Sequence, residues 1–247
     1  MSENRVVLIT GASRGIGAAT AILAAKRGWN VAINYLSNAA AADAVAASCR
    51  SEGVEAVVVR ADVADEAAVV EMFKDVAKHF GRLDALVNNA GILGTQGTFD
   101  GFDGDRLRAV VNTNVLGAMY VAREALRLMI RAQTGVIVNV GSRASTLGSA
   151  NEFVDYAATK GAIDSLTTGL SIEAGPHGIR VNCVRPGLIR TDIHASSGEA
   201  GRVDRLQHGV PMGRGGEADE VAAAIVWLMS EEASYVSGAM IEVSGGR

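Results

Sequence analysis

Apolar and polar positions follow two different patterns along this chain. Short runs rich in Val, Ile and Leu predict β-strands, at Val6–Thr10, Asn30–Tyr35, Ala56–Ala61, Ala85–Asn88, Val136–Val140, Arg180–Val184 and Met240–Val243. Alanine-rich stretches between them predict helices, at Ile16–Arg27, Ala39–Ser48, Glu66–His79, Leu116–Arg131, Asp155–Glu173 and Asp219–Leu228. Because strands alternate with helices, we expect an α/β fold with a doubly wound parallel sheet of about seven strands and helices on both faces, in three α/β/α layers.

The composition supports one domain over residues 1–247. Of the 247 residues, 49% are apolar, which suffices for a large core, and only 4% are aromatic. The 29 glycines and the many alanines and valines suit tight packing of helices on a parallel sheet. No repeat, low-complexity tract or linker divides the chain.

Residues 188–217 are the one stretch with the character of a polar loop. They include Ser-Ser-Gly-Glu-Ala-Gly and Gly-Arg-Gly-Gly. Ligands of doubly wound sheets bind beyond the carboxyl ends of the strands, so we expect this segment to be a lid over the substrate. An ordinary surface loop is the alternative.

Charge and cysteine content exclude several classes of function. The net charge is -4, from 23 basic and 27 acidic residues, so we expect no nucleic-acid partner. Cys49 and Cys183 match no metal or redox spacing, and we expect two reduced thiols and no metal site. No apolar run approaches the roughly 20 residues of a spanning helix. We therefore expect a cytoplasmic protein without membrane contact.

The first predicted strand runs into a glycine-rich turn that precedes a helix. Its Gly-x-x-x-Gly-x-Gly spacing lets the backbone approach a diphosphate, which also meets the positive end of the helix dipole. A glycine-rich turn without a ligand is the alternative. We expect a dinucleotide to contact this turn at Gly11, Ser13, Arg14, Gly15, Ile16 and Gly17.

The second predicted strand indicates which dinucleotide binds. Enzymes that select NAD place an acidic residue there for the ribose 2′-hydroxyl. This strand ends in Asn34 and Tyr35 without an acid, whereas Arg14 in the first turn can pair with a 2′-phosphate. We therefore expect NADP as the cofactor, with NAD as the alternative, and include Asn34 and Tyr35 in its site. Arg14 could instead be a solvated residue at the helix start.

The third and fourth predicted strands end in further polar and small residues. Asp62 and Val63 follow the third strand, and a carboxylate at Asp62 could accept a hydrogen bond from the adenine amino group. The fourth ends in Asn-Asn-Ala-Gly, where Asn89, Ala90 and Gly91 offer amides and a wall of small residues beside the dinucleotide. Ordinary turn chemistry is the alternative for both.

Tyr156 and Lys160 are the candidate reactive pair. Positions i and i+4 share one face of a helix, so the ammonium can approach the phenol. A fixed positive charge favours the phenolate and suits the phenol to general acid/base chemistry. Ser142 lies upstream, where its hydroxyl could hold a carbonyl or alcohol oxygen beside Tyr156. A solvated helix face is the alternative reading of this spacing.

Taken together, these motifs resemble the single-domain short-chain dehydrogenase/reductase family. They occur in family order over nearly the whole chain: Gly11-x-x-x-Gly-x-Gly17, Asp62, Asn88-Asn-Ala-Gly91, Asn114, Ser142, Tyr156-x-x-x-Lys160 and Pro186-Gly187. The resemblance implies a Rossmann-type fold and an NADP(H)-dependent oxidoreductase acting on a small alcohol or ketone. It is especially close to bacterial members of undefined substrate.

The resemblance also implies a role for each matching residue. Tyr156 exchanges a proton with the substrate oxygen, Lys160 supports it and binds the nicotinamide ribose, and Ser142 orients the carbonyl. Asn114 positions a water that links Lys160 to solvent. After the turn at Pro186 and Gly187, the backbone of Ile189 meets the carboxamide. Thr191 bonds the carboxamide or a phosphate.

Two of these assignments have rivals in the sequence. Ser145 competes with Ser142, but only Ser142 directly follows a predicted strand. Asn112 competes with Asn114, which better matches the family pattern. Gly141 and Arg143 flank Ser142 where many relatives carry a second serine, and one extra residue separates Ser142 from Tyr156. We expect that residue to reshape the loop through Asn151.

Two other functions are carried as alternatives. A 3-oxoacyl-[acyl-carrier-protein] reductase should present a basic docking patch, for which the chain offers Arg127, Arg131 and Arg143. A non-catalytic dinucleotide-binding regulator could have lost the reactive residues, which this chain retains. The resemblance further implies a homotetramer. Among the histidines, which we expect on the surface, His194 is the best placed to line a substrate pocket.

Overall fold

A computed structural model describes residues 5–247, and within them seven parallel strands form one sheet. Their spatial order is β3-β2-β1-β4-β5-β6-β9. The order reverses between β1 and β4, the type of switch point where a ligand crevice opens. The strands are β1 Val6–Ile9, β2 Asn30–Tyr35, β3 Ala56–Arg60, β4 Ala85–Asn88, β5 Gly135–Val140, β6 Ile179–Pro186 and β9 Met240–Val243.

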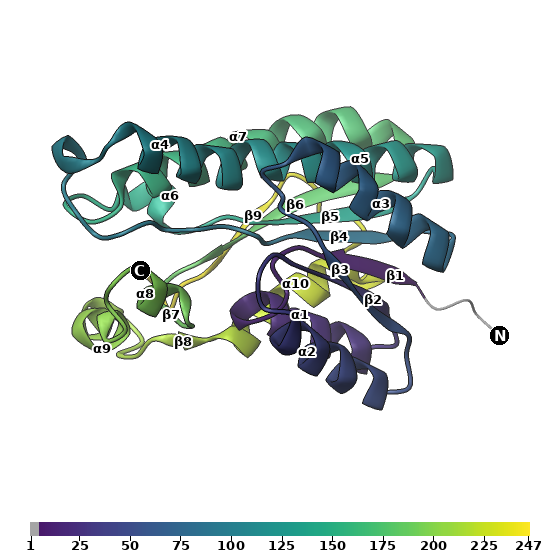
Figure 1. The fold of residues 1–247 in the computed structure, drawn as a ribbon, viewed down its shortest axis with the longest axis horizontal. Helices are drawn as coiled ribbons and strands as arrows, with labels where there is room; N and C mark the ends of the chain where they lie inside the picture. The colour runs from purple at the N-terminus through teal and green to yellow at the C-terminus, as the bar shows by residue number, and fades with distance from the viewer. Residues whose placement is uncertain (1–4) are drawn as a thin grey trace.

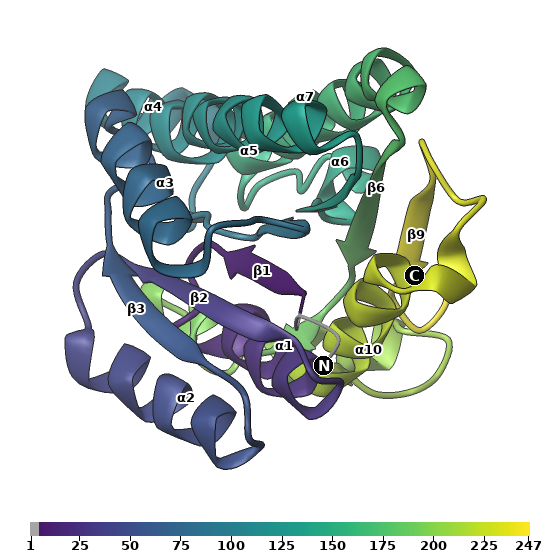
Figure 2. The ribbon, with the colours of Figure 1, turned by 90° about the vertical axis from the view of Figure 1, so that its right-hand side faces the viewer.

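Helices cover both faces of the sheet (Figure 1, Figure 2). Helices α1, α2 and α10 lie on one face, and α3, α5 and α7 lie on the other. This arrangement confirms the predicted three-layer Rossmann-type fold. Within residues 5–247, no helix combines the length and apolar content needed to cross a membrane. The helices are α1 Gly15–Lys26, α2 Ala39–Ser51, α3 Glu66–Phe80, α5 Ala118–Ala132, α7 Val154–Ala174 and α10 Ala218–Met229.

The central strand β1 shows why the sheet needs both helical layers. Its four residues are almost completely buried. Because successive side chains of a strand point to opposite faces, Val7 and Ile9 pack into the core under α1 and α10, whereas Val6 and Leu8 pack into the core under α3 and α5. Burial of each such side chain stabilises the fold by about 1.5–3 kcal/mol.

The predicted elements are all present, with ends shifted by a few residues, but the region before α5 differs. There the structure adds helix α4 (Gly104–Val111) and a π-helical turn, η2 (Asn112–Gly117). A Cβ on Gly117 would lie 2.9 Å from the carbonyl oxygen of Val63, so this turn packs directly on the backbone after β3. The wider π-helical turn breaks the 3.6-residue period, so the hydrophobic periodicity of the sequence did not predict it.

Residues 188–217 contain more regular structure than the loop that the sequence suggested. They form two short strands, β7 (Ile189–Arg190) and β8 (Gly216–Glu217), and two short helices, α8 (Ile193–Ser196) and α9 (Arg202–Leu206). Leu188, Val203 and Val210 form a small core of their own. Figure 1 shows the segment at the end of the sheet where the strands terminate. We refer to residues 188–217 as the lid segment.

Candidate functional site

A cavity of about 580 Å³ opens at the carboxyl ends of the strands, between the glycine-rich turn, the start of α7 and the lid segment. It brings together most of the residues singled out in the sequence. Those lining it are Gly11, Ser13, Arg14, Gly15, Ile16, Asn34, Tyr35, Asp62, Val63, Asn89, Ala90, Gly91, Ser142, Tyr156, Lys160, Pro186, Gly187, Ile189 and Thr191. Gly17 and Asn114 do not line the cavity.

The glycine-rich turn has the shape of a cradle for a phosphate group. Gly11 and Gly15 have positive φ angles of 62° and 56°, which L side chains rarely adopt. At Gly17 a Cβ would lie 2.7 Å from Asn89 Nδ2 and 2.7 Å from the Gly11 carbonyl oxygen. Helix α1 starts at Gly15 without a side-chain cap on its N-terminal N–H groups. Such free N–H groups suit the diphosphate of a dinucleotide.

Thr10 and Asn89 fix this turn against the end of β4. The Thr10 hydroxyl accepts hydrogen bonds from the backbone N–H groups of Asn89 (2.9 Å) and Ala90 (3.0 Å). The Asn89 side chain donates to the carbonyl oxygens of Thr10 (2.8 Å) and Gly11 (3.2 Å). Asn89 therefore shapes the cradle with its amide and borders the cavity at the same time.

Asn34 borders the cavity while its side chain is already fully engaged. Its Oδ1 accepts from the Gly11 N–H (3.2 Å), and its Nδ2 donates to the carbonyl oxygens of Val59 (3.3 Å) and Ala61 (3.1 Å). The residue thus joins the glycine-rich turn to β2 and β3. Asp62 also lines the cavity, and its Oδ1 accepts from the Ala64 N–H at 2.9 Å.

The Arg14 side chain is exposed at the rim of the cavity. Among residues 5–247 its guanidinium has no hydrogen-bond or ion-pair partner. Tyr35, at the end of β2, also lines the cavity. A group with several negative oxygens bound there would meet the guanidinium without having to displace another anion.

Tyr156 and Lys160 lie on one face of α7 and both line the cavity. The Lys160 side chain is buried, and its Nζ donates a 2.7 Å hydrogen bond to the carbonyl oxygen of Val140 at the end of β5. The same Nζ lies 5.5 Å from the centre of the Tyr156 ring. A phenol held beside a fixed ammonium can exchange a proton with a bound oxygen.

Ser142 follows β5 and lines the cavity, whereas its rival Ser145 is not among the lining residues. The Ser142 Oγ accepts from the Ala144 N–H at 3.1 Å, which leaves its own hydroxyl hydrogen available. Ser145 is committed to the carbonyl oxygen of Ser142, to which it donates at 2.9 Å. The geometry therefore favours Ser142 as the hydroxyl beside Tyr156.

Asn114 lies in the π-helical turn, is almost fully buried and braces the wall behind Lys160. Its Oδ1 accepts from the Ile92 N–H (2.8 Å), and its Nδ2 donates to the Ile92 carbonyl oxygen (2.9 Å) and to Thr159 Oγ1 (3.2 Å). A Cβ on Gly91 would lie 3.3 Å from Asn114 Oδ1 and 3.7 Å from Lys160 Nζ. Asn112, the alternative in the sequence, is exposed.

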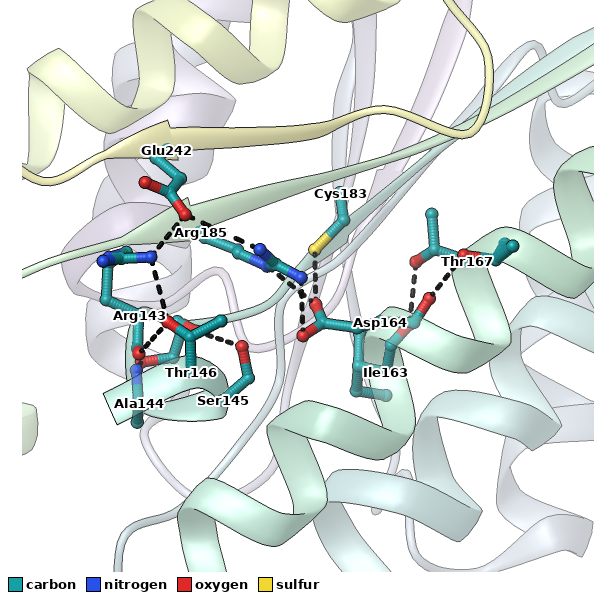
Figure 3. A network of polar contacts seen from close by, with 12 residues as sticks. Arg143, Ala144, Ser145, Thr146, Ile163, Asp164, Thr167, Cys183, Arg185 and Glu242 are labelled. Atoms are coloured by element: carbon teal, nitrogen blue, oxygen red, sulfur yellow. Dashed lines mark hydrogen bonds and ion pairs between the residues drawn. The ribbon is translucent and has the colours of Figure 1, made fainter. Parts of the chain in front are cut away.

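A polar network behind Ser142 explains why Gly141 and Arg143 stand on either side of it (Figure 3). A Cβ on Gly141 would lie 2.6 Å from Cys183 Sγ, so a second serine does not fit there. Arg143 bonds Glu242 on β9, and Glu242 also faces Arg185, which forms a 2.9 Å ion pair with Asp164 of α7. The network ties the Ser142 loop to β6, β9 and α7.

The loop between Ser142 and Tyr156 is tightly turned. It contains the short helix α6 (Ala144–Leu147) and three residues with positive φ angles: Gly148 (76°), Ser149 (47°) and Asn151 (62°). The loop delivers Phe153 to the cavity, where the side chain is completely buried yet borders the open space. Sequence spacing indicated a changed loop but not this aromatic wall.

Glu152 joins this loop to the lid segment, a contact that the sequence did not reveal. Its carboxylate pairs with Arg202 and, at 2.8 Å, with Arg205. Burial alone would raise the pKa of Glu152, but the hydrogen bonds from Arg205 and Arg202 outweigh it and lower the pKa. Arg205 also pairs with Glu199. No local motif predicts the pairs of Glu152 with Arg202 and Arg205, because the partners lie 50 and 53 residues apart.

His194 is buried and lines the cavity, so the expected surface position is wrong for this histidine. Its Nε2 lies 3.0 Å from the carbonyl oxygen of Ile189. Burial, together with the nearby charge of Arg202, lowers the pKa of the His194 imidazole. Among residues 5–247, no group of three or more His, Cys, Asp or Glu side chains could hold a metal ion.

Comparison with known proteins identifies relatives along the whole chain. Residues 11–247 match the family model described as "Enoyl-(Acyl carrier protein) reductase". The chain is 54% identical to "Uncharacterized oxidoreductase YgfF" of Escherichia coli (strain K12) over 245 residues, covering 98% of this chain and 99% of that protein. It is 34% identical to the 3-oxoacyl-[acyl-carrier-protein] reductase FabG of Staphylococcus aureus, covering 100% and 99% of the two chains.

Solved structures agree with this relationship. Levodione reductase superposes with a TM-score of 0.92 at 32% identity, covering 98% of this chain and 96% of that one. NAD+-bound xylitol dehydrogenase gives 0.91 at 32% identity and covers both chains completely. A short-chain dehydrogenase from Burkholderia cenocepacia J2315 in complex with NADP gives 0.90 at 35% identity, covering 99% and 97%.

Proposed function

The chain belongs to the short-chain dehydrogenase/reductase family of oxidoreductases, and we propose that it transfers a hydride between NADP(H) and a small alcohol or ketone. The observation that carries this proposal is the convergence of Ser142, Tyr156 and Lys160 on one cavity with the glycine-rich turn. That cradle fits a dinucleotide, since Gly11 and Gly15 hold left-handed turns and α1 presents uncapped N–H groups. When bound, the cofactor supplies or accepts the hydride.

In this proposal the protein's own residues handle the substrate oxygen and its proton. Ser142 donates its free hydroxyl hydrogen to the carbonyl oxygen and orients it towards Tyr156. The phenol of Tyr156 gives its proton to the substrate oxygen, so the ketone, the hydride that the cofactor would supply and this proton together make the alcohol. Lys160 stabilises the phenolate that remains, and a proton from solvent restores the phenol.

Asn114 contributes by positioning rather than by contact with substrate. Its amide fixes Ile92 and Thr159 on either side of the Lys160 pocket. A hydrated path from Lys160 past this turn would return the proton to Tyr156. Pro186, Gly187, Ile189 and Thr191 complete the cavity wall on the nicotinamide side. A Cβ on Gly15 would lie 3.4 Å from Thr191 Cγ2, which brings Thr191 to the edge of the cradle.

The preference for NADP rests on the end of β2 and on Arg14. Neither Asn34 nor Tyr35 is acidic, so no carboxylate at this position repels a 2′-phosphate. The guanidinium of Arg14, exposed and without a partner among residues 5–247, provides the complementary charge. Relatives of known structure bind NAD+ in one case and NADP in another.

Reduction of a 3-oxoacyl thioester on acyl carrier protein is the second candidate, and similarity to the Staphylococcus aureus FabG favours it. The candidate basic patch counts against it. Arg127 pairs with Glu124 at 2.8 Å, and Arg143 is engaged by Glu242. Of the three arginines, only Arg131 is exposed without a partner among residues 5–247. We therefore place a small alcohol or ketone first. A non-catalytic regulator is disfavoured because the reactive set is retained.

A substrate screen tests the proposal. The purified protein is mixed with NADPH or NADH and a panel of small ketones, and with a 3-oxoacyl thioester. We expect NADPH oxidation with at least one small ketone and little with the thioester. Turnover of the thioester alone would replace the first candidate by the second. Tight dinucleotide binding without turnover of any panel member would favour the regulator. The homotetramer and the cytoplasmic location remain predictions.

A further inference from the structure

Two polar atoms at the lid side of the cavity have no hydrogen-bond partner. Within residues 5–247, they are the only buried side-chain nitrogen or oxygen atoms in this condition: His194 Nδ1 and Arg202 Nε. Both side chains line the cavity. An unpaired polar atom inside a protein costs free energy, and a bound group that pairs with it recovers that cost. The two atoms therefore indicate a ligand group that binds between the lid segment and the rest of the cavity.

The other contacts of His194 and Arg202 determine whether each unpaired atom donates or accepts a hydrogen bond. His194 Nε2 lies 3.0 Å from the carbonyl oxygen of Ile189, which can only accept, so Nε2 carries the hydrogen. With the imidazole neutral, Nδ1 is then an acceptor. Arg202 Nε carries a hydrogen and is a donor. The pair offers one acceptor and one donor, the complement of a hydroxyl group, which donates through its hydrogen and accepts through its oxygen.

The charges around the pair argue against an anionic ligand. Arg202 pairs with Glu152, and Arg205 pairs with both Glu152 and Glu199, so two cations face two anions. Among these four side chains, no positive charge is left over for a carboxylate or a phosphate. The lone pair of His194 Nδ1 would also repel such a group. An uncharged hydroxyl satisfies both atoms without disturbing these ion pairs.

We propose that His194 and Arg202 form a subsite that binds an uncharged hydroxyl group of the substrate, separate from the oxygen that reacts at Tyr156. This assignment rests on the proposed function, since it takes the ligand to be the alcohol or ketone that the enzyme converts. The ring of Phe153 supports the subsite, because the Arg202 guanidinium lies 5.2 Å from its centre. The substrate is then a hydroxyketone or polyol rather than a simple or anionic ketone.

Three flexible ketones of similar length test this subsite. They are 5-hydroxypentan-2-one, its isostere hexan-2-one, in which a methyl group replaces the hydroxyl, and the carboxylate 4-oxopentanoate. For the wild-type enzyme with NADPH, we expect kcat/KM for the hydroxyketone to exceed that for the other two by about tenfold or more, because a methyl group leaves both polar atoms unpaired.

Two variants remove the two atoms separately. His194→Phe keeps a ring but removes the acceptor, and Arg202→Lys keeps the charge next to Glu152 but removes the Nε–H donor. In each, the preference for the hydroxyketone should fall to about threefold or less, because kcat/KM for the hydroxyketone falls more than kcat/KM for hexan-2-one. The matched controls are His208→Phe and Arg214→Lys. Neither side chain lines the cavity, and Arg214 pairs with Glu220 rather than with Glu152, so both variants should leave the preference unchanged.

A binding measurement separates this proposal from the proposed function. Calorimetry measures the affinity of the three ketones for Tyr156→Phe saturated with NADPH, where proton transfer is removed. Binding that favours the hydroxyketone and weakens with an added His194→Phe change supports the subsite, even if no ketone is turned over and the proposed reaction fails. Equal binding and turnover of all three ketones, a preference for 4-oxopentanoate, or a hydroxyketone preference that survives both variants would overturn it.

Discussion

The two ends of the cavity are built by different means. At the dinucleotide end, backbone geometry sets the shape: Gly11 and Gly15 adopt left-handed turns, and Gly17 leaves no room for a side chain. At the lid end, side chains set the shape, through ion pairs from Glu152 to Arg202 and Arg205. A backbone cradle suits a ligand that is constant throughout a family. Side-chain contacts can be exchanged one at a time, which suits a substrate that varies.

Among the changes that compare the two ends of the cavity, the largest effect is expected from adding one methyl group at the backbone end. In Gly17→Ala the new Cβ would lie 2.7 Å from both Asn89 Nδ2 and the Gly11 carbonyl oxygen, so the cradle must shift. Strain of about 1–3 kcal/mol corresponds to dinucleotide binding that is about 5- to 150-fold weaker. Titration of NADPH fluorescence measures it.

Gly169→Ala is the matched control for this change. Gly169 lies within α7, and a Cβ there would meet no other atom within 4 Å. Because alanine favours helix more than glycine does, this variant should bind NADPH normally and gain about 0.5–1 kcal/mol of stability. If Gly17→Ala also bound NADPH with unchanged affinity, the steric account of the cradle would be wrong.

A smaller effect is expected where a side chain acts at the same end. Arg14→Gln removes the charge proposed to meet the 2′-phosphate but leaves the backbone intact. We expect the ratio of kcat/KM for NADP(H) over NAD(H) to fall by about five- to tenfold, since an exposed ion pair contributes modestly. Arg27→Gln, at the opposite end of α1, is the control. An unchanged ratio in Arg14→Gln would remove Arg14 from cofactor selection.

The smallest effect is expected at the lid end. Glu152→Gln keeps the shape but removes the charge that holds Arg202 and Arg205, so KM for the substrate should rise by about threefold to tenfold with a smaller change in kcat. Because the folded-state pKa of Glu152 is lowered, its pairing is fully present above its unfolded pKa of about 4.3 and is lost as pH falls through the lowered value.

Comparing KM at two pH values checks this reasoning. Between pH 7 and pH 5, Glu152 of the wild-type enzyme should stay ionised and paired with Arg202 and Arg205. The ratio of the two KM values, variant over wild type, should therefore stay constant. A ratio that shrinks towards one on going from pH 7 to pH 5 would mean that Glu152 is already protonated there, contrary to its lowered pKa.

The contrast between the end of the cavity shaped by the backbone and the end shaped by side chains also explains how much the sequence could predict. The parallel sheet and the cradle were predictable because few residues satisfy them. A side chain at Gly17 would collide with the cradle, and an apolar run such as β1 must be buried on both faces. The i, i+4 spacing also placed Tyr156 and Lys160 on one face of α7. These features depend on local geometry, which the sequence records directly.

The remainder depends on contacts between distant segments. The pairing of Glu152 with Arg202 joins residues that are 50 positions apart, and the burial of His194 follows from how the lid segment folds back. The π-helical turn around Asn114 follows from packing against Val63, which no local period records. Asn34 was predicted within the cofactor site, and only the structure reveals that its amide is engaged by Gly11 of the turn and by the carbonyl oxygens of Val59 and Ala61.

The central claim is that Tyr156 moves the proton when hydride is transferred. Pre-steady-state reduction of an accepted ketone by Tyr156→Phe, with Tyr120→Phe as a control on α5 away from the cavity, tests it most directly. We predict that Tyr156→Phe slows the chemical step by about a hundredfold to ten-thousandfold and leaves NADPH affinity within about threefold of wild type. A Tyr156→Phe enzyme that reduces the ketone at the wild-type rate would contradict the account.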